Sequence, residues 1–475
     1  MEGDNRIEPR TLKGFQDLLP EDVIPRKAVV AAIEAVFEKY GFLPIETPAL
    51  EYLEILLAAG GEETNKELFR LESPEGEPIA LRFDLTVPFA RLMAQYPDKL
   101  KAPFRRYAIG PVWRADKPGP GRFRQFTQFD IDAAGAESVA VDAEIIAIMC
   151  EVMRVVGASS CVLVNNRKLV DALLAGCGIA EQARQKHVLR VVDKLKKVGI
   201  ANIRLELGEG RIDESGDPIP GVRLDAATID KIIAFIEVKG ATRVDVVDHV
   251  DAVLPETELS RAAVGEMREL SAALDALGVD EAAARFDPSL ARGLDYYTGP
   301  VFETVLPDLP EFGSVMGGGR YNQLVERFLE RPIPCTGMSI GLDRLMAALT
   351  HLGAIPAART TVQALVVSLG GVPAAEALRV AAELRAAGIR TEAYFGPKMN
   401  LKAQLSHADR YEIPVAVIIG PDEAAQGVVS VKDLVAGKQS REHIEDHGAY
   451  RQAGKTAQFT VPRAGMAAAV KGLLA

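Results

Sequence analysis

The chain has 475 residues, of which 48% are hydrophobic and 25% are charged. At roughly 100–200 residues per domain, this length predicts about two to four domains, with ample room for a buried core. The net charge of −11 argues against a surface that is basic throughout. The longest apolar runs, 364–369 and 414–420, are far shorter than the roughly 20 residues that span a bilayer, and the charged start, Met1–Arg10, lacks the apolar core of a signal peptide. We therefore expect a soluble, cytoplasmic protein that crosses no membrane.

The first predicted element is an amphipathic helix at Pro25–Tyr40, whose apolar side chains recur on one side: Val29, Ile33, Val36 and Phe37. Gly41 is expected to end this helix. The segment that follows, Phe42–Glu51, contains two prolines, which lack the backbone N–H that a central strand needs. This segment is therefore predicted to be an edge or interface strand.

Three further strands are predicted at Ile79–Phe83, Arg105–Arg114 and Phe123–Asp132. In a strand, successive side chains point to opposite faces. The odd positions of the third strand include Phe123, Phe129 and Ile131, whereas its even positions are mostly polar: Arg124, Phe126, Gln128, Asp130 and Asp132. This split indicates an antiparallel strand with two different faces.

From about Arg167 to Phe286 helical periodicity dominates, and aromatic residues become scarce. Helices are predicted at Asn166–Ala175, Ala180–Val198, Ala226–Lys239 and Ser260–Leu277. No cluster of chemically suggestive side chains appears here, so we interpret this stretch as an inserted, mostly helical domain. Strands return at Leu294–Leu306 and Gly313–Tyr321, and a helix at about Ile340–Leu352 closes this part.

The last part, Thr361–Ala475, alternates strands with helices, which predicts a small α/β domain after a linker at Gly353–Thr361. Its elements are strands at Val362–Leu369, Arg390–Phe395 and Val415–Gly420, with helices at Pro373–Ala387 and Asn400–Tyr411. Residues 360–475 hold 13 Lys and Arg against 11 Asp and Glu, which leaves −13 for residues 1–359. A near-neutral segment on an acidic chain permits a local RNA-binding face, and chance variation explains it equally well.

The densest cluster of chemically active side chains is RRYAIGPVWRADKPGPGRFRQFTQFDID, residues 105–132. Five arginines lie on two strands joined by a turn rich in glycine and proline: Arg105, Arg106, Arg114, Arg122 and Arg124. Guanidinium groups held close together suit phosphate oxygens and keep their charge at any pH. Phe126 shares a face with Gln128 and Asp132, so its ring is placed to stack on a base. The alternative is a solvated hairpin with surface arginines.

Three segments that contain glycines are further candidates. LARGLDYYTG at Leu290–Gly299 suits a polar small ligand, or else Asp295 simply pairs with Arg292. GGGRY at Gly317–Tyr321 lets a ligand approach the backbone closely, or forms a bulge. GMSIGLDR at Gly337–Arg344 leads into a helix and suits either an anion or plain helix packing.

Asp84 and Thr86 lie two residues apart in IALRFDLTVPFAR, so on a strand they would share one face. A carboxylate beside a hydroxyl suits an ammonium group. The alternative is a strand end at which Asp84 caps a helix.

Several familiar chemistries are missing from the sequence. There is no GxGxxG that opens a helix, no GxxxxGK[ST] and no zinc-type spacing, and all six histidines lie outside these clusters. The scattered cysteines favour ordinary buried thiols in a reducing compartment over catalytic or metal-binding ones: Cys150, Cys161, Cys177 and Cys335. We assign no metal ligands, and we expect an enzyme of this sequence to act by positioning substrates and stabilising phosphate charge.

In this order, the segments resemble the class II aminoacyl-tRNA synthetases, and among them the histidyl-tRNA synthetases. The helix and strand that end at Pro48 look like motif 1, Arg105–Asp132 looks like motif 2, and Gly337–Arg344 looks like motif 3. RGLDYYTG at Arg292–Gly299 and GGGRY at Gly317–Tyr321 look like two signatures of the histidyl-tRNA synthetases. The resemblance runs from about Lys13 to the C-terminus.

This resemblance implies an α+β fold in which helices flank an antiparallel catalytic sheet. The catalytic domain would occupy 1–166 and 287–355, a helical insertion 167–286, and a C-terminal α/β anticodon-binding domain 360–475. The implied reaction joins L-histidine to ATP as histidyl-adenylate, with Mg²⁺, and then transfers the histidyl group to the 3′-terminal adenosine of tRNA-His. Motif 1 implies a homodimer.

The resemblance also implies a nucleotide site. Arg114 would contact the α-phosphate of ATP, and Arg122 would hold the outer phosphates. Phe126 would stack on adenine, and Arg344 would clamp the other side of the nucleotide. Asp116 stands where some relatives carry a glutamate, so it keeps a carboxylate but shortens its reach.

Seven residues would form the histidine pocket: Asp84, Thr86, Gln128, Asp132, Arg292, Tyr296 and Tyr297. The first three would bind the α-amino group, while Asp132 and Tyr297 would read the imidazole. Arg292 would lie between the histidine carboxylate and the α-phosphate. Asp132 also replaces a glutamate of the family pattern.

Two other interpretations compete with this one. One is the regulatory paralogue of ATP phosphoribosyltransferase, which shares the catalytic fold but usually lacks the C-terminal domain. The other is a catalytically silent, synthetase-like protein that binds RNA or acts as a sensor. The whole unit Thr361–Ala475 argues against the first, and the retained Arg114, Arg292 and Arg344 argue against the second.

Overall fold

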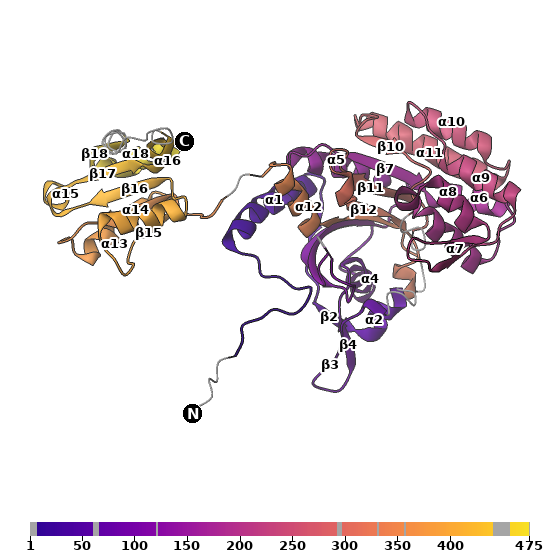
Figure 1. Cartoon of the computed structure of the whole chain (residues 1–475), viewed down its shortest axis with the longest axis horizontal. Coiled ribbons are helices and arrows are strands. Elements are labelled where there is room, and N and C mark those ends of the chain that lie inside the picture. The colour runs from indigo at the N-terminus through magenta and orange to yellow at the C-terminus, as the bar shows by residue number, and fades with distance from the viewer. Residues whose placement is uncertain are drawn as a thin grey trace. The chain divides into compact units, whose positions relative to one another are not determined.

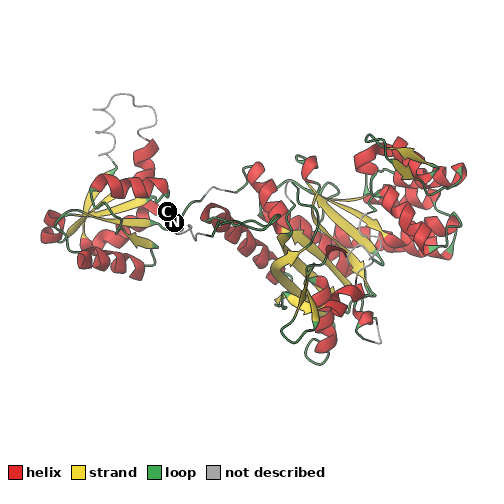
Figure 2. Cartoon of the chain, turned by 60° about the horizontal axis from the view of Figure 1, so that its bottom comes forward, coloured by secondary structure: helices red, strands yellow, loops and turns green. Residues whose placement is uncertain are grey.

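The computed structural model of the chain describes residues 7–59, 66–119, 122–291, 297–329, 332–355, 358–439 and 457–474. These residues form two compact units, one built on Val29–Ile355 and the other on the residues from 358 onward. Each unit has a central sheet with helices packed against it (Figure 1, Figure 2). Each unit also buries its own hydrophobic core.

The first unit is organised around an eight-stranded sheet in the order β1-β5-β6-β13-β12-β11-β7-β10. Neighbouring strands run antiparallel except at the two edges, where β1 pairs with β5 and β10 pairs with β7 in parallel. In chain order the strands are β1 Leu43–Pro44, β5 Phe104–Trp113, β6 Gln125–Ala134, β7 Cys161–Asn166, β10 Ala284–Phe286, β11 Pro300–Val305, β12 Ser314–Tyr321 and β13 Cys335–Gly341. The predicted antiparallel sheet is confirmed. The edge strand expected over Phe42–Glu51 covers only Leu43–Pro44 in this sheet, and Leu50–Tyr52 is a strand of a second, smaller sheet.

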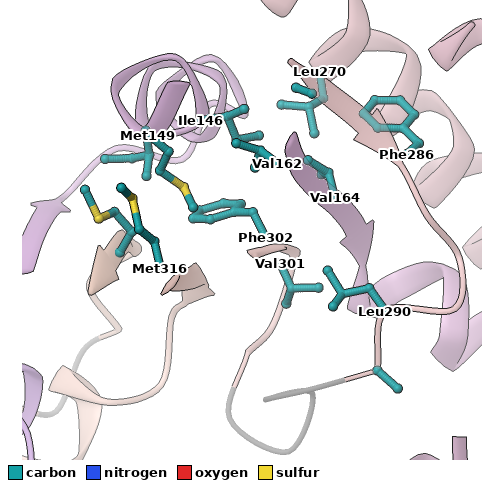
Figure 3. Close-up of a cluster of buried hydrophobic side chains, with 14 of the residues drawn as sticks. Ile146, Met149, Val162, Val164, Leu270, Phe286, Leu290, Val301, Phe302 and Met316 are labelled. Carbon is teal, nitrogen blue, oxygen red and sulfur yellow. The ribbon is translucent and has the colours of Figure 1, made fainter. Parts of the chain in front are cut away.

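Helices cover one face of this sheet: α1 Pro20–Lys39, α5 Ala140–Val155 and α12 Leu342–His351. The odd residues of β6 point toward them, and the ring of Phe129 lies 4.9 Å from that of Phe37 on α1. Figure 3 shows the neighbouring part of this core, where Ile146 and Met149 of α5 face Phe302 of β11. The sequence analysis did not predict α5, because it packs between the sheet and another helix and is apolar on most sides.

The inserted segment is mostly helical, as predicted, and gathers its helices beside β7 and β10 (Figure 1). Its elements are α6 Arg167–Gly176, α7 Gln182–Val192, α8 Leu195–Leu207, β8 Gly210–Ile212, β9 Pro218–Pro220, α9 Ala226–Ile236, α10 Arg243–Val253 and α11 Glu258–Ala276. The single helix predicted at Ala180–Val198 is wrong, because α7 ends at Val192. Gly199, at φ +76°, then kinks α8, a conformation that a side chain would strain.

A smaller sheet in the order β2-β4-β3 comprises Leu50–Tyr52, Pro78–Leu81 and Arg70–Glu72, and it packs near α2 Leu53–Ala59 and α4 Thr86–Gln95. The strand predicted at Ile79–Phe83 therefore ends at Leu81. Asp84 and Thr86 do not lie on a strand. Asp84 instead accepts a hydrogen bond from the backbone N–H of Val87 at 2.9 Å, in the turn that starts α4. The alternative, in which Asp84 caps a helix, is therefore nearer to the structure, although Asp84 stands one residue before the N-cap, Leu85.

The second unit is a five-stranded sheet in the order β15-β14-β16-β17-β18. Its elements are β14 Ala364–Ser368, α13 Ala374–Ala386, β15 Thr391–Ala393, α14 Leu401–Arg410, β16 Val415–Ile419, α15 Pro421–Gln426, β17 Val428–Asp433, α16 Leu434–Gln439, β18 Gln458–Pro462 and α18 Met466–Leu474. Alternate residues of β14 enter two separate hydrophobic clusters, so helices cover both faces of this sheet. The predicted C-terminal α/β domain is confirmed.

Candidate active site

A cavity of about 590 Å³ lies on the face of the eight-stranded sheet opposite α1 and α5. Strand register explains this placement, because Glu303, Gly317, Ser339 and Asp130 align in one row across β11, β12, β13 and β6. Three of these four residues line the cavity directly. Ile131, the next residue on β6, points into the hydrophobic core instead. The alternation predicted for this strand therefore separates a polar cavity from a core.

The glycines of GGGRY make the sheet surface hollow at this cavity. A Cβ added to Gly317 would have its nearest neighbour at 3.9 Å, so this position opens onto free space. A Cβ added to Gly319 would lie 2.8 Å from the ring of Tyr297, so this glycine makes room for the ring. The strand pairs regularly with β13 from Met316 to Tyr321, which favours close approach over the bulge.

Two arginines and one aromatic ring line the outer end of the cavity. The guanidinium of Arg114 lies 5.2 Å from the centroid of the Phe126 ring, and its Nε donates to the carbonyl of Phe83 at 3.2 Å. Arg344, in the first turn of α12, donates from Nη1 to the carbonyl of Ser314 at 2.9 Å. These contacts hold two permanent positive charges beside a flat ring, which is a suitable frame for a nucleotide.

The segment between β5 and β6 supplies three more charged groups that line the cavity: Asp116, Lys117 and Arg122. Arg122 belongs to a tight turn, in which its backbone N–H donates to the carbonyl of Gly119 at 2.9 Å. Asp343 of α12 accepts a hydrogen bond from the backbone N–H of Thr127 at 2.6 Å. This bond fixes the start of α12 against β6, next to the arginines.

The five arginines of the hairpin do not form one cluster, which corrects the sequence analysis. Arg105 points to the helix-covered side, where its Nη2 lies 2.6 Å from Glu144. Arg106 is fully buried in an ion pair, and Arg124 donates to the carbonyl of Asp116 at 3.1 Å. Alternation along β5 sends Arg105 and Arg106 to opposite faces, so only Arg114 and Arg122 line the cavity.

Two buried carboxylates, Asp130 and Asp132, lie on the same face of β6 as Gln128, although neither is part of the cavity lining. Asp132 is only 2% exposed, pairs with the guanidinium of Arg106 and accepts a hydrogen bond from the hydroxyl of Tyr321. Burial raises the pKa of Asp132 to about 6, although Arg106 and Tyr321 oppose this shift. Asp130, two residues earlier, is 1% exposed, and burial raises its pKa to about 7. The sequence analysis assigned no partner to Asp132 and no role to Asp130.

The remaining predicted histidine-binding residues fall into three groups. Gln128 and Tyr297 line the cavity, and Gln128 donates from Nε2 to the hydroxyl of Ser339 at 2.9 Å. Burial, followed by the nearby carboxylates Asp132 and Asp130, raises the pKa of Tyr297 above its ordinary range. Asp84, Thr86 and Asp132 are absent from the cavity lining, although the charge of Asp84 acts on Asp132. Arg292 and Tyr296 lie outside the described residues.

Sequence reasoning missed several residues that line the cavity, among them Lys117, Asp193, Glu303 and Ser339. Lys117 lies inside motif 2, so its sequence position alone could have suggested a role in the site. Glu303 and Ser339 become visible only when β11 and β13 are placed in register with β6. Asp193 comes from the end of α7 in the insertion, so no local pattern points to it.

Within the part of the chain that the structure describes, no helix is long and apolar enough to cross a membrane. The same residues contain no group of three or more His, Cys, Asp or Glu side chains arranged to hold a metal ion. The cysteines are unpaired, two of them buried and two half-buried. Burial raises the pKa of Cys150 to about 12, which leaves this thiol unreactive.

The fold and the cavity together define a class of protein. A mostly antiparallel sheet that holds arginines from a β-hairpin and from the helix after β13, with an α/β unit at the C-terminus, is the arrangement of a class II aminoacyl-tRNA synthetase.

Comparison with known proteins narrows this class. The sequence model of histidyl-tRNA synthetase matches residues 14–345, and the model of the anticodon binding domain matches residues 363–452. The histidine–tRNA ligase of Paracoccus denitrificans is 41% identical, with all of both chains covered, and that of Caulobacter vibrioides is 39% identical over 99% of this chain and 98% of its own length. The solved histidyl-tRNA synthetase of Nostoc sp. PCC 7120 superposes with a TM-score of 0.81 at 33% identity, covering 98% of this chain and all of that one. The chain therefore belongs to the histidyl-tRNA synthetase family, and as an enzyme it is a ligase.

Proposed function

We propose that the cavity binds ATP at its outer end and histidine at its inner end, and that it joins them as histidyl-adenylate. The observation that carries this assignment is a single cavity that Arg114 and Arg344 line at its outer end and Gln128, Ser339 and Tyr297 line at its inner end. The buried carboxylates of Asp130 and Asp132 follow Gln128 on the same face of β6, behind this lining. The triphosphate of ATP is anionic, whereas the α-amino group of histidine is cationic. The arginines of the outer end therefore match the triphosphate in charge, and the polar inner end, with two carboxylates buried behind it, suits the ammonium group.

At the outer end, Arg114 binds the α-phosphate, and Phe126 stacks on the adenine ring. Support comes from the position of Arg114 over the Phe126 ring and from the place of both side chains in the cavity lining. Arg344 clamps the nucleotide from α12, and Arg122 with Asp116 meets the outer phosphates or their bound cation.

At the inner end, Asp84, Thr86 and Gln128 hold the α-amino group of histidine. The Oε1 of Gln128 is a buried acceptor without a hydrogen-bond donor among the described residues, which suits an ammonium group. Tyr297 and Asp132 line the side chain of histidine, with Tyr296 beside them. Arg292 is outside the described residues, and its place in the RGLDYYTG signature assigns it to the charge between the histidine carboxylate and the α-phosphate.

The chemistry is an in-line attack of the histidine carboxylate on the α-phosphate, which expels pyrophosphate. Arg114 and Arg292 stabilise the negative charge that spreads over the α-phosphate in the transition state. This step needs no general base from the protein, because the carboxylate of histidine is already a nucleophile.

Mg²⁺ fits this cavity as a cation carried largely by the nucleotide. Asp116 and Glu303 offer carboxylates in the lining, although the described residues contain no full cage of protein ligands. When bound, Mg²⁺ would neutralise the departing pyrophosphate.

The histidyl group then passes to the 3′-hydroxyl of the terminal adenosine of tRNA-His. The C-terminal unit, which matches the anticodon binding domain, reads the anticodon region, and the helical insertion contacts the acceptor arm. The enzyme works in the cytoplasm as a homodimer in which motif 1 forms the interface.

Histidine-dependent exchange of pyrophosphate into ATP tests this function. We expect histidine alone, from a panel of the amino acids, to support exchange. Exchange with a different amino acid would indicate another specificity. The absence of exchange with every amino acid would favour the regulatory paralogue or a silent, synthetase-like protein.

A further inference from the structure

The N-terminal segment Leu12–Phe15, which precedes α1, lies against the hairpin that carries arginines of the cavity. The carbonyl of Gly14 accepts a hydrogen bond from the backbone N–H of Arg124 at 2.7 Å. The carbonyl of Arg124 accepts in turn from the backbone N–H of Arg114 at 2.8 Å. Two main-chain hydrogen bonds therefore connect the N-terminal segment to an arginine that lines the cavity.

This part of the hairpin extends beyond the sheet. The ladder between β5 and β6 ends at the pair of Trp113 and Gln125, and the bond between Arg114 and Arg124 lies outside it. A two-stranded ribbon is only marginally stable in water without further support. Contacts from other segments therefore help to decide where the residues of this loop lie.

Gly14 approaches the hairpin too closely for a side chain. Its φ of +85° is in the left-handed region, and a Cβ there would lie 2.8 Å from Cγ of Pro118 and 2.9 Å from Cγ of Arg124. The first of these atoms belongs to a rigid ring, and Pro118 itself lines the cavity. Gly76 has nearly the same φ, +83°, but an added Cβ there would have nothing within 4 Å. The close contact at Gly14 is therefore specific to the hairpin and does not follow from the left-handed backbone alone.

A third segment contacts both the N-terminal segment and the hairpin. The rings of Phe15 and Phe69 meet edge to face, with their centroids 6.0 Å apart. Two residues before Phe69, the carbonyl of Glu67 accepts a hydrogen bond from the backbone N–H of Ala115 at 2.8 Å. An aromatic contact therefore fixes the N-terminal segment on one side, and its main-chain bond to the hairpin fixes it on the other.

We propose that the N-terminal segment positions the loop of the hairpin for ATP, with Gly14 as the contact that sets the place of Pro118 and of the backbone of Arg124. This inference rests on the proposed function, because it takes ATP as the ligand of the outer end. The segment itself is absent from the cavity lining, so its residues act through the loop. The loop presents three charged groups to the cavity: Asp116, Lys117 and Arg122.

The competing role for the N-terminal segment is to tie the chain to the catalytic unit without any effect on the site. The two roles differ in what a side chain at position 14 would change. A purely structural contact affects the melting temperature alone. A positioning contact also raises the KM for ATP and leaves the KM for histidine near its wild-type value.

The first experiment compares Gly14→Ala with Gly76→Ala in the full-length protein. Both variants place a side chain on a left-handed backbone, but only Gly14→Ala brings it against the hairpin. In pyrophosphate exchange, Gly14→Ala should raise the KM for ATP on the order of tenfold and leave the KM for histidine within about twofold. Gly76→Ala should leave both values within about twofold. A KM for ATP equal to that of the control, or equal rises in both KM values, would overturn the proposal.

A double variant tests whether the contact with Pro118 carries the effect. Pro118→Ala removes the Cγ with which a side chain at position 14 collides. The rise in the KM for ATP that Gly14→Ala causes should therefore shrink by about threefold or more in the Pro118→Ala background. An undiminished rise would contradict the proposal.

Hydrogen–deuterium exchange follows the hairpin without reference to activity. The backbone N–H of Arg124, which donates to Gly14, should lose protection in Gly14→Ala and keep it in Gly76→Ala. If the wild-type enzyme shows no histidine-dependent pyrophosphate exchange, the proposed function fails, whatever the protection of this N–H. If the wild-type enzyme is active and Gly14→Ala loses the protection but keeps the KM for ATP, only the positioning role fails.

Discussion

The two central sheets of the molecule use the alternation of side chains in different ways. In the C-terminal sheet, Val366 and Leu365 of β14 enter two hydrophobic clusters on opposite faces. In the catalytic sheet, Phe129 of β6 enters a hydrophobic cluster, while Gln128 on the opposite face lines a polar cavity. A strand such as β14, which is apolar on both faces, only stabilises its sheet. A strand such as β6, which is apolar on one face and polar on the other, marks the candidate active site.

Replacing Phe129 by alanine tests the core side of this comparison and should have the largest effect. The ring is fully buried and packs on Phe37 and Tyr107, so the variant should lose about 3–5 kcal/mol of the free energy of unfolding. Denaturant titration followed by circular dichroism measures this loss. The matched control is Phe126→Ala on the cavity face, which should keep stability and raise the KM for ATP about tenfold. Equal stability losses in the two variants would remove the distinction between the faces.

Replacing Arg114 by alanine tests the cationic end of the cavity. Loss of the guanidinium that meets the α-phosphate should lower the rate of adenylate formation on the order of 100-fold or more, and the same is expected of Arg292→Ala. Pyrophosphate exchange at saturating histidine measures this rate. Arg124→Ala is the control, because Arg124 lies on the same hairpin but is absent from the cavity lining. A rate for Arg114→Ala within threefold of the control would contradict the assignment.

A chain that ends after Ala358 tests whether the two sheets have separate tasks. The catalytic unit keeps its own core, so the truncated protein should retain pyrophosphate exchange. Charging of tRNA-His should fall at least tenfold, because the proposed anticodon contacts are gone. Aminoacylation with radioactive histidine measures this effect, and undiminished charging would show that the C-terminal unit does not read the anticodon.

The pH dependence of histidine binding tests the carboxylates buried behind the inner end of the cavity. The pKa of Asp130 is raised to about 7 by burial, with Asp132 and Asp84 adding to the shift and Arg106 and Ser339 opposing it. The carboxylate is therefore ionised above about pH 7 and protonated below it. The KM for histidine should be flat at higher pH and rise by up to about tenfold per unit as the pH falls below 7.

The substrate imidazole titrates in the same range, so the control is Asp130→Asn. This variant keeps the titration of the substrate and should lose the part of the profile that belongs to Asp130. Superimposable profiles for the variant and the wild-type enzyme would assign the whole pH dependence to histidine itself.

The sequence by itself determined the order of the elements, the antiparallel character of the catalytic sheet and the chemistry of its motifs. Local patterns sufficed for the polar face of β6, for the arginines at 114 and 344 and for the C-terminal α/β unit, because side-chain periodicity and glycine positions are local properties. The end of α7 at Val192 and the hydrogen bond from Val87 to Asp84 are also local features, but the sequence patterns did not distinguish them from a longer helix and from a strand.

Only the tertiary structure decided which of the polar groups are available to a ligand. Asp130 and Asp132 look alike in the sequence, but the structure buries both carboxylates behind the cavity lining, with Ser339 beside one and Tyr321 beside the other. Partners of a buried charge come from strands that are distant in the chain. Their register is therefore set by the whole sheet, and no single segment contains that information.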